Sequence, residues 1–113
     1  KERMRVRFPL AAPTYGAGPE GRLAQRNMYF IYVLLSKKDG NFYTGYSRDP
    51  WERLECHNSG KVDATKYRVP FEMIYLEGFV NQQDATSREK FFKTGWGRTH
   101  LNKILKNYFN STA

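Results

Sequence analysis

The sequence contains one cysteine, Cys56, and no long apolar run. A single cysteine cannot form an intramolecular disulfide or a cysteine-based zinc site, so a reducing cytoplasm is the expected location. No segment approaches the roughly 18 consecutive apolar residues of a membrane-spanning helix, and no membrane association is expected. The apolar patch FPLAAP near the N-terminus is too short and too rich in proline to act as a signal peptide.

Acidic residues are also scarce. The 113 residues include 19 Lys and Arg against 11 Asp and Glu, for a formal net charge of +8. Such an excess favours a polyanionic partner, nucleic acid above all, although charge by itself argues for association and not for a fold. Half of the excess lies in residues 1–27, and the remaining 13 basic and 9 acidic side chains make a mildly basic domain. Many domains of that charge never contact nucleic acid, so the charge alone does not decide whether this domain binds nucleic acid.

Residues 1–27 have no sustained hydrophobic period. They contain six residues that interrupt helices and strands, namely Pro9, Pro13, Gly16, Gly18, Pro19 and Gly21. We expect a disordered or loosely attached basic arm, either a remnant or misplaced start ahead of the domain or a tail that binds phosphates. The folded domain is expected at residues 28–109, with residues 110–113 as a short tail.

The hydrophobic pattern of the folded part predicts strands followed by helices. Strands rich in aromatic and branched residues are expected at residues 28–36, 41–47 and 71–79. Asp39 and Gly40 tolerate a tight turn, which makes the first two strands a hairpin. Helices are expected at residues 50–58, 82–94 and 97–109. Asp49 and Glu52 predict a capping box for the first helix, and Gly95 is expected to end the second.

Two tyrosines of the hairpin, Tyr32 and Tyr43, have ten residues between them. Whether they share a face depends on the turn, so two ordinary half-buried tyrosines are the alternative. Arg53 and His57 are four residues apart and therefore lie on one face of the first helix. Arginine offers a planar fork to phosphate oxygens and neutral histidine accepts a proton, so the pair suits chemistry on a phosphate. A solvated helix face is the alternative interpretation of this pair.

Glu89 lies in the middle of the second helix, between Ala85 and Phe92. This position puts a carboxylate at the border of the apolar face, where a metal ion would offset the cost of its desolvation. An ion pair with Lys93 at i+4 is the alternative, and it would leave the carboxylate solvated.

Five elements occur in order along the chain: FIY, then YTG after ten residues, an arginine–leucine pair at Arg53, HNSG, and REKFFK. Together they resemble the GIY-YIG nuclease family over about Tyr29 to Leu105, and most of all its small stand-alone bacterial members. Phe30 replaces the glycine of the first motif and Thr44 the isoleucine of the second, which leaves the tyrosines intact. The resemblance implies an α+β fold, a three-stranded antiparallel sheet flanked by helices in the order β-β-α-β-α-α.

The resemblance also implies roles for individual residues. Tyr32 and Tyr43 match the motif tyrosines, and Arg53 matches the arginine that binds the scissile phosphate. His57 lies where members carry a histidine or tyrosine near the attacking water. Glu89 matches the single carboxylate that holds one Mg²⁺ or Mn²⁺.

Further residues are expected to contact nucleic acid. Gly45 matches the glycine that closes the second motif, where backbone or substrate approaches closely. Asn102 is the nearest match to the family's late asparagine, with a spacing that differs by one residue. The remaining candidates form a basic loop, Lys61, Lys66 and Arg68, with Tyr67 for base stacking.

The expected activity is metal-dependent hydrolysis of DNA phosphodiester bonds, selective for structure more than sequence, in DNA repair or recombination. RNA is the alternative substrate, and a requirement for a protein partner or a homodimer is left open. A non-catalytic nucleic-acid-binding module on the same fold is the alternative function, and a protein-interaction module is a third. His57 beside Arg53 is expected to be the general base or a relay to it, with a rate that rises through roughly pH 6 to 7; Tyr32 is the other candidate base.

Overall fold

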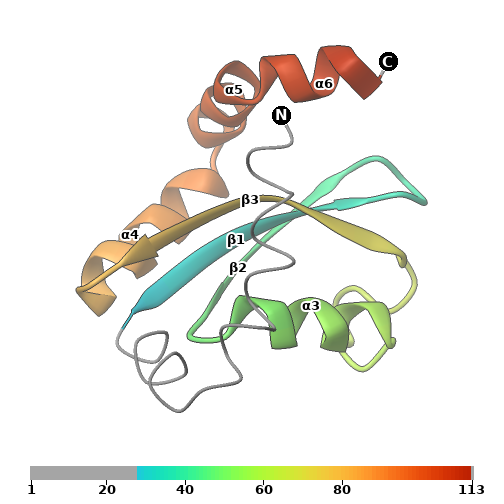
Figure 1. Ribbon diagram of the computed structural model, residues 1–113, viewed down its shortest axis with the longest axis horizontal. Coiled ribbons are helices and arrows are strands. Elements are labelled where there is room, and N and C mark those ends of the chain that lie inside the picture. The colour runs from blue at the N-terminus through green and yellow to red at the C-terminus, as the bar shows by residue number, and fades with distance from the viewer. Residues whose placement is uncertain (1–27, 113) are drawn as a thin grey trace.

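The computed structural model describes residues 28–112, which form a three-stranded antiparallel sheet with helices on both of its faces (Figure 1). The arm predicted at residues 1–27 and Ala113 lie outside the described residues. The sheet confirms the predicted α+β class. In the described part, no helix combines the length and the apolar character that crossing a bilayer requires.

The central strand of the sheet is β1 (Tyr29–Ser36), with β2 (Phe42–Ser47) on one side and β3 (Phe71–Phe79) on the other. Its sequence YFIYVLLS consists almost wholly of aromatic and branched side chains, which favour a strand. The four residues from Ile31 to Leu34 are buried, because helices cover both faces of this strand.

The strand register decides whether the two hairpin tyrosines share a face. Tyr32 pairs with Gly45, and Tyr43 pairs with Leu34. Paired residues project to the same side of an antiparallel sheet, and Leu34 is two residues beyond Tyr32 on the same strand. Both tyrosines therefore point to the same face of the sheet.

Within the described residues, four helices complete the fold: α3 (Pro50–Asn58), α4 (Gln82–Phe92), α5 (Gly95–Ile104) and α6 (Lys106–Thr112). The first covers the face of Tyr32 and Leu34, where its Leu54 packs against them. The other face carries Ile31 and Val33, which belong to a core cluster shared with α4 and α5. The three C-terminal helices lie together on that side (Figure 1). The two faces of β1 thus belong to two separate cores.

The boundaries of α3 agree with the prediction, but only one of the two hydrogen bonds of the predicted capping box is present. The Asp49 carboxylate accepts a hydrogen bond from the backbone N–H of Glu52 at 3.2 Å, as expected for an N-cap. The backbone N–H of Asp49 donates to Ser47 Oγ at 2.9 Å, and not to the Glu52 side chain that a capping box would use.

The C-terminal helices depart further from the sequence prediction. One helix was predicted at residues 97–109, whereas α5 already begins at Gly95 and ends before Leu105. The early start follows from Thr94, whose hydroxyl accepts the backbone N–H of Gly97 at 3.1 Å and caps the helix. Leu105 packs against the core with φ of −110° and ψ of 22°, which interrupts the helix. Helix α6 then continues to Thr112, through most of the predicted tail.

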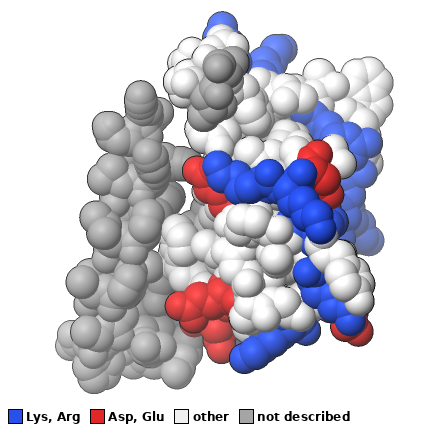
Figure 2. All heavy atoms as spheres, turned by 90° about the vertical axis from the view of Figure 1, so that its right-hand side faces the viewer, with Lys and Arg blue, Asp and Glu red and all other residues white. Residues whose placement is uncertain are grey.

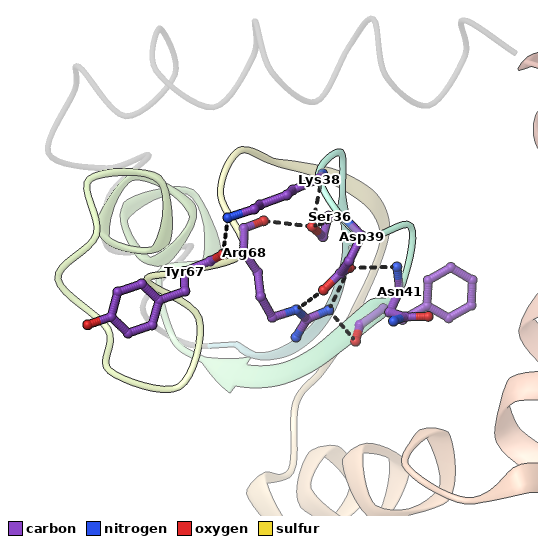
Figure 3. Close-up of polar contacts among 7 residues, drawn as sticks. Ser36, Lys38, Asp39, Asn41, Tyr67 and Arg68 are labelled. Atoms are coloured by element: carbon purple, nitrogen blue, oxygen red, sulfur yellow. Dashed lines mark hydrogen bonds and ion pairs between the residues drawn. The ribbon is translucent and has the colours of Figure 1, made fainter.

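Hydrogen bonds fasten the loop of residues 61–70 to the β1–β2 turn (Figure 3). Ser36 Oγ donates to the carbonyl oxygen of Arg68 at 2.6 Å, and Arg68 Nε donates to Asp39 Oδ2 at 2.7 Å. Arg68 Nη2 also donates to the carbonyl oxygen of Phe42 at 3.3 Å. The Arg68 guanidinium holds the pKa of Asp39 at about 2, so the pair stays charged under ordinary conditions. The loop is thereby held against the hairpin at a fixed position.

Gly45 leaves room for the Tyr32 ring, because an added Cβ would collide with Cζ and Oη of Tyr32. We expect Gly45→Ala to displace this ring and to lower the free energy of unfolding by about 1–3 kcal/mol, measured by urea denaturation. Gly95→Ala is the matched control, because nothing lies within 4 Å of a Cβ added there. Equal stability of Gly45→Ala and the parent protein would contradict the close contact between Gly45 and the Tyr32 ring.

Candidate active site

Two tyrosines and a histidine meet between the sheet and α3. Tyr32 Oη and His57 Nε2 are 3.0 Å apart, and the Tyr43 and His57 ring centroids are 4.8 Å apart. His57 is completely buried, and Tyr32 keeps 1% of its surface exposed. Strand β1 supplies Tyr32, β2 supplies Tyr43 and the last turn of α3 supplies His57. The structure therefore brings together three of the predicted catalytic residues.

Thr65, which sequence reasoning missed, is the second partner of His57. His57 Nδ1 and Thr65 Oγ1 are 2.8 Å apart, and Thr65 is completely buried. The Thr65 hydroxyl also lies 3.5 Å from the carbonyl oxygen of Val62, and a hydroxyl that donates there accepts the Nδ1–H of His57. Nε2 is then unprotonated and accepts the O–H of Tyr32. No spacing in the sequence pointed to this threonine, because it lies in an irregular loop.

Burial and charge set the protonation of this group. Burial, with the Arg53 guanidinium as the second cause, lowers the pKa of His57 to about 4. His57 is therefore neutral at pH 7, which agrees with its two hydrogen bonds. Burial raises the pKa of Tyr32 above its ordinary value, and the neighbouring Arg53 guanidinium opposes that rise. The value for His57 corrects the sequence-based expectation, because an inflection from this residue would lie near pH 4 and not at pH 6 to 7.

Glu89 interacts with Tyr32 through its charge, which is one of the causes that raise the pKa of Tyr32. Its side chain is 21% exposed, and its carboxylate lies 3.1 Å from Lys93 Nζ. The ion pair that the sequence left as an alternative is thus present, on a side chain that is half-buried and not simply solvated.

Glu89 is also the only member of the predicted site that suits a metal ion. Within residues 28–112, no cluster of three or more His, Cys, Asp or Glu side chains forms a metal cage. A single half-buried carboxylate fits a hard divalent ion that keeps several waters and takes its other ligands from a phosphate. The donor set therefore fits Mg²⁺ or Mn²⁺ and does not suit a structural zinc ion.

Two of the predicted nucleic-acid contacts in the basic loop form ion pairs within the protein. Arg68 is engaged by Asp39, and Lys66 Nζ lies 3.5 Å from Asp63 Oδ1. Lys61 is exposed, and so is Tyr67, at 75% of its surface.

Gly45 and Asn102 are the two remaining candidates for contacts with nucleic acid. Gly45 is covered by the ring of Tyr32, which explains the glycine by a contact within the protein. Asn102 is exposed on α5, which packs on the face of the sheet opposite to α3.

Comparisons with known proteins define the class to which this fold and site belong. Residues 28–104 match the family model of the GIY-YIG catalytic domain. The chain therefore belongs to the GIY-YIG family, which confirms the resemblance seen in the sequence.

Similar proteins come from several bacteria. A UPF0213 protein of Streptococcus pneumoniae is 43% identical over 65 residues, which cover 57% of this chain and 65% of that protein, less than two thirds of its length. A UPF0213 protein of Streptococcus agalactiae is 42% identical over 79 residues, which cover 69% and 89% of the two chains. The solution NMR structure of a UPF0213 protein from Bacillus halodurans is 30% identical, with a TM-score of 0.45 and coverage of 68% and 84%. These names specify no reaction.

The lowered pKa of His57 makes stability depend on pH. Between a folded pKa of about 4 and the ordinary value of 6.5, the unfolded chain binds a proton that the folded chain excludes. Stability from this group is therefore complete above about pH 7 and falls as the pH drops from about 6.5 toward 4. We expect a loss of about 2 kcal/mol between pH 7.5 and pH 5, measured by urea denaturation.

His57→Gln tests this assignment, because its stability should change less over the same pH range than that of the parent protein. His100→Gln is the matched control, since His100 lies outside the hydrogen bonds of Tyr32 and Thr65, and it should keep the parent dependence. An unchanged dependence in His57→Gln would contradict a buried, neutral His57.

Proposed function

We propose that this protein is a metal-dependent endonuclease that hydrolyses phosphodiester bonds of DNA, selects its substrate by structure, and acts in repair or recombination. The observation that carries this proposal is the chain of hydrogen bonds from Thr65 through His57 to Tyr32, with Arg53 beside the phenol. A buried proton acceptor and a cation thus meet at one hydroxyl group. Membership in the GIY-YIG family supports the same class of reaction.

The chain's own residues would move one proton along this path. Water attacks the phosphorus atom in line with the leaving oxygen and gives a proton to Tyr32 Oη. Tyr32 gives its own proton to His57 Nε2, while Thr65 Oγ1 holds the other imidazole nitrogen and keeps Nε2 free to accept. The new P–O bond forms, the bond to the leaving oxygen breaks, and a solvent proton neutralises the leaving oxygen. His57 then returns its proton to solvent through Tyr32. Arg53 balances the negative charge that develops on the phosphate.

The pKa shifts require the two proton transfers to occur together. Burial raises the pKa of the Tyr32 phenol and lowers the pKa of the His57 imidazole to about 4. Both shifts disfavour a resting tyrosinate–imidazolium pair. Tyr32 therefore stays neutral until water attacks, and His57 acts as a relay because Tyr32 and Thr65 already occupy both of its ring nitrogens.

Glu89 would hold the divalent ion, Mg²⁺ or Mn²⁺. When bound, the ion would supply a Lewis acid at the phosphate and at the leaving oxygen. Before an ion binds, Lys93 pairs with the Glu89 carboxylate, so the negative charge that would otherwise repel the phosphate is neutralised.

A non-catalytic nucleic-acid-binding module is the second candidate function. Such a module needs donors on its surface, and it has no use for an unprotonated imidazole nitrogen buried behind a phenol. The pairing of Tyr32 with His57 therefore favours the enzyme over the binding module.

Glu89→Gln should abolish Mg²⁺-dependent nicking and leave DNA binding in EDTA unchanged, because it removes the ion's ligand and keeps the side chain's size. Asp84→Asn is the matched control, since Asp84 is an exposed carboxylate on the same helix. The substrates are flapped, branched and plain duplex DNA, with RNA beside them. Full activity of Glu89→Gln would refute the assigned role of this carboxylate.

Arg53→Ala should slow nicking by about 100- to 1,000-fold, as expected for the loss of a donor that stabilises the transition state. Arg48→Ala is its control, because the Arg48 guanidinium stacks over the Tyr29 ring and is not part of the site. Equal rates in the two variants would exclude Arg53 from the reaction.

The pH–rate profile distinguishes the candidate bases. With a folded His57 pKa of about 4, the rate under saturating Mg²⁺ should be nearly level from about pH 5.5 to 8. Thr65→Val should be about tenfold slower or worse because Nδ1 loses its partner, whereas Thr65→Ser keeps the oxygen and most of the rate. A rise through pH 6 to 7 would restore an unshifted histidine as the base. A steady climb to pH 9 would identify Tyr32 as a base that works without His57.

A further inference from the structure

Positive charge without a carboxylate partner gathers in the C-terminal part of the domain. From Lys90 onward the sequence has five Lys and Arg residues and no Asp or Glu, whereas residues 28–89 have eight basic and nine acidic residues. We call these five exposed residues the C-terminal cations: Lys90, Lys93, Arg98, Lys103 and Lys106. Lys93 pairs with Glu89, and no described carboxylate forms an ion pair with the other four.

The cations around the β1–β2 hairpin are different, because most of them are already paired. Lys37 pairs with Glu72, and Lys66 and Arg68 have the acidic partners described above. Figure 2 views the molecule from this side, and Lys and Arg side chains lie next to Asp and Glu there. A phosphate bound on this side would have to compete with those carboxylates. The C-terminal cations are therefore the stronger candidates for phosphate contacts.

Trp96 lies among the C-terminal cations and is 81% exposed. A single exposed apolar side chain is ordinary in itself, but this one is carried by a tightly held turn. Thr94 Oγ1 donates to the carbonyl oxygen of Phe91 at 2.6 Å and accepts the backbone N–H of Gly97 at 3.1 Å. A Cβ added at Gly97 would collide with the backbone of Phe91. The turn is thus fixed on α4 while the indole remains open to solvent.

The chain also limits how far Trp96 lies from the carboxylate of the site. Lys93 is one helical turn beyond Glu89, about 6 Å along the axis, and three further residues add at most about 11 Å. The Cα atoms of Glu89 and Trp96 are therefore within about 17 Å. A strand of DNA advances about 3.4 Å per nucleotide, so Trp96 would meet a nucleotide within about five of a phosphate held at Glu89.

We propose that Trp96 stacks on an unpaired base of DNA while Arg98 and Lys103 bind the adjoining phosphates. Trp96 and Lys103 are seven residues apart, so two turns of α5 bring them to one face. Base stacking is tolerant of sequence, and it requires a base that is not paired inside a duplex. The inference rests on the proposed function for DNA as the ligand. It adds the feature that is recognised, a single-stranded segment close to the phosphate that is cut.

Binding measured in EDTA tests this inference without any cleavage. Fluorescein-labelled DNA is titrated as a plain duplex and as the same duplex with a five-nucleotide single-stranded flap, with anisotropy as the readout. Trp96→Ala should weaken binding of the flapped DNA by about tenfold and binding of the plain duplex by less than twofold. Trp96→Phe should retain most of the affinity. Tyr67→Ala is the matched control, because Tyr67 is an aromatic of similar exposure on the side where the cations are paired.

A second measurement follows the indole itself. In Trp51→Phe, Trp96 is the remaining tryptophan, and its fluorescence should be quenched by the flapped DNA and not by the plain duplex. The triple variant Lys90→Ala, Arg98→Ala, Lys103→Ala should reduce the salt dependence of binding by about two ions, whereas Lys37→Ala should leave it unchanged. If Trp51→Phe does not fold, the quench in the parent protein and its loss in Trp96→Ala serve instead.

Either of two results would overturn the inference: an equal loss in Trp96→Ala and Tyr67→Ala, or a loss confined to Tyr67→Ala. Failure of the proposed enzyme activity would be seen separately, as absence of Mg²⁺-dependent nicking in the parent protein. Selective binding through Trp96 without nicking would keep this inference and reject the nuclease.

Discussion

The hydrogen bond between Tyr32 and His57 is the contact on which the rest of the site depends. Both side chains are almost fully enclosed, and an unpaired polar group at that depth would cost about 1–3 kcal/mol. Pairing both nitrogens of His57 requires a sheet residue on one side and a loop residue on the other. Thr65 supplies the second partner because Arg68 fastens its loop to the β1–β2 turn. One buried pair thus fixes β1, α3 and the loop relative to one another.

The hairpin makes the space that this pair needs. Tyr32 pairs with Gly45, and the missing side chain lets the phenol ring lie over the neighbouring strand. The same register turns Tyr43 toward His57, since a shift by one residue would send its side chain to the other face of the sheet. Two glycine-dependent contacts therefore shape the molecule. Gly45 seats the phenol, and Gly97 seats α5 on the end of α4.

Much of this architecture was predictable from the sequence, and the parts that were not have identifiable causes. Strand β3 and helix α3 were predicted because aromatic and branched runs and an Asp-Pro helix start are local signals. The break at Leu105 was missed because an amphipathic pattern continues through it, and the packing that interrupts the helix is not local. Thr65 was missed because a buried loop hydroxyl has no period or motif. The lowering of the His57 pKa to about 4 was underestimated because only the neighbouring charge, and not the depth of burial, can be inferred from i and i+4 spacing.

In the proposed function, charge divides the domain into two parts with different tasks. The part that encloses Tyr32, His57 and Arg53 has nine acidic and eight basic residues between residues 28 and 89, so its attraction for a polyanion is weak. That balance suits chemistry, because a strongly positive surround would compete with a divalent ion for Glu89. The attraction must then come from elsewhere, and the helices after Glu89 carry basic residues alone. Glu89 and Lys93 form the junction between the two parts, since the last carboxylate of the chain pairs with one of the C-terminal cations. The residues that would set the affinity for DNA and the residues that would carry out the reaction therefore lie in different segments of the chain. The ion pair between Glu89 and Lys93 lies where these two segments meet.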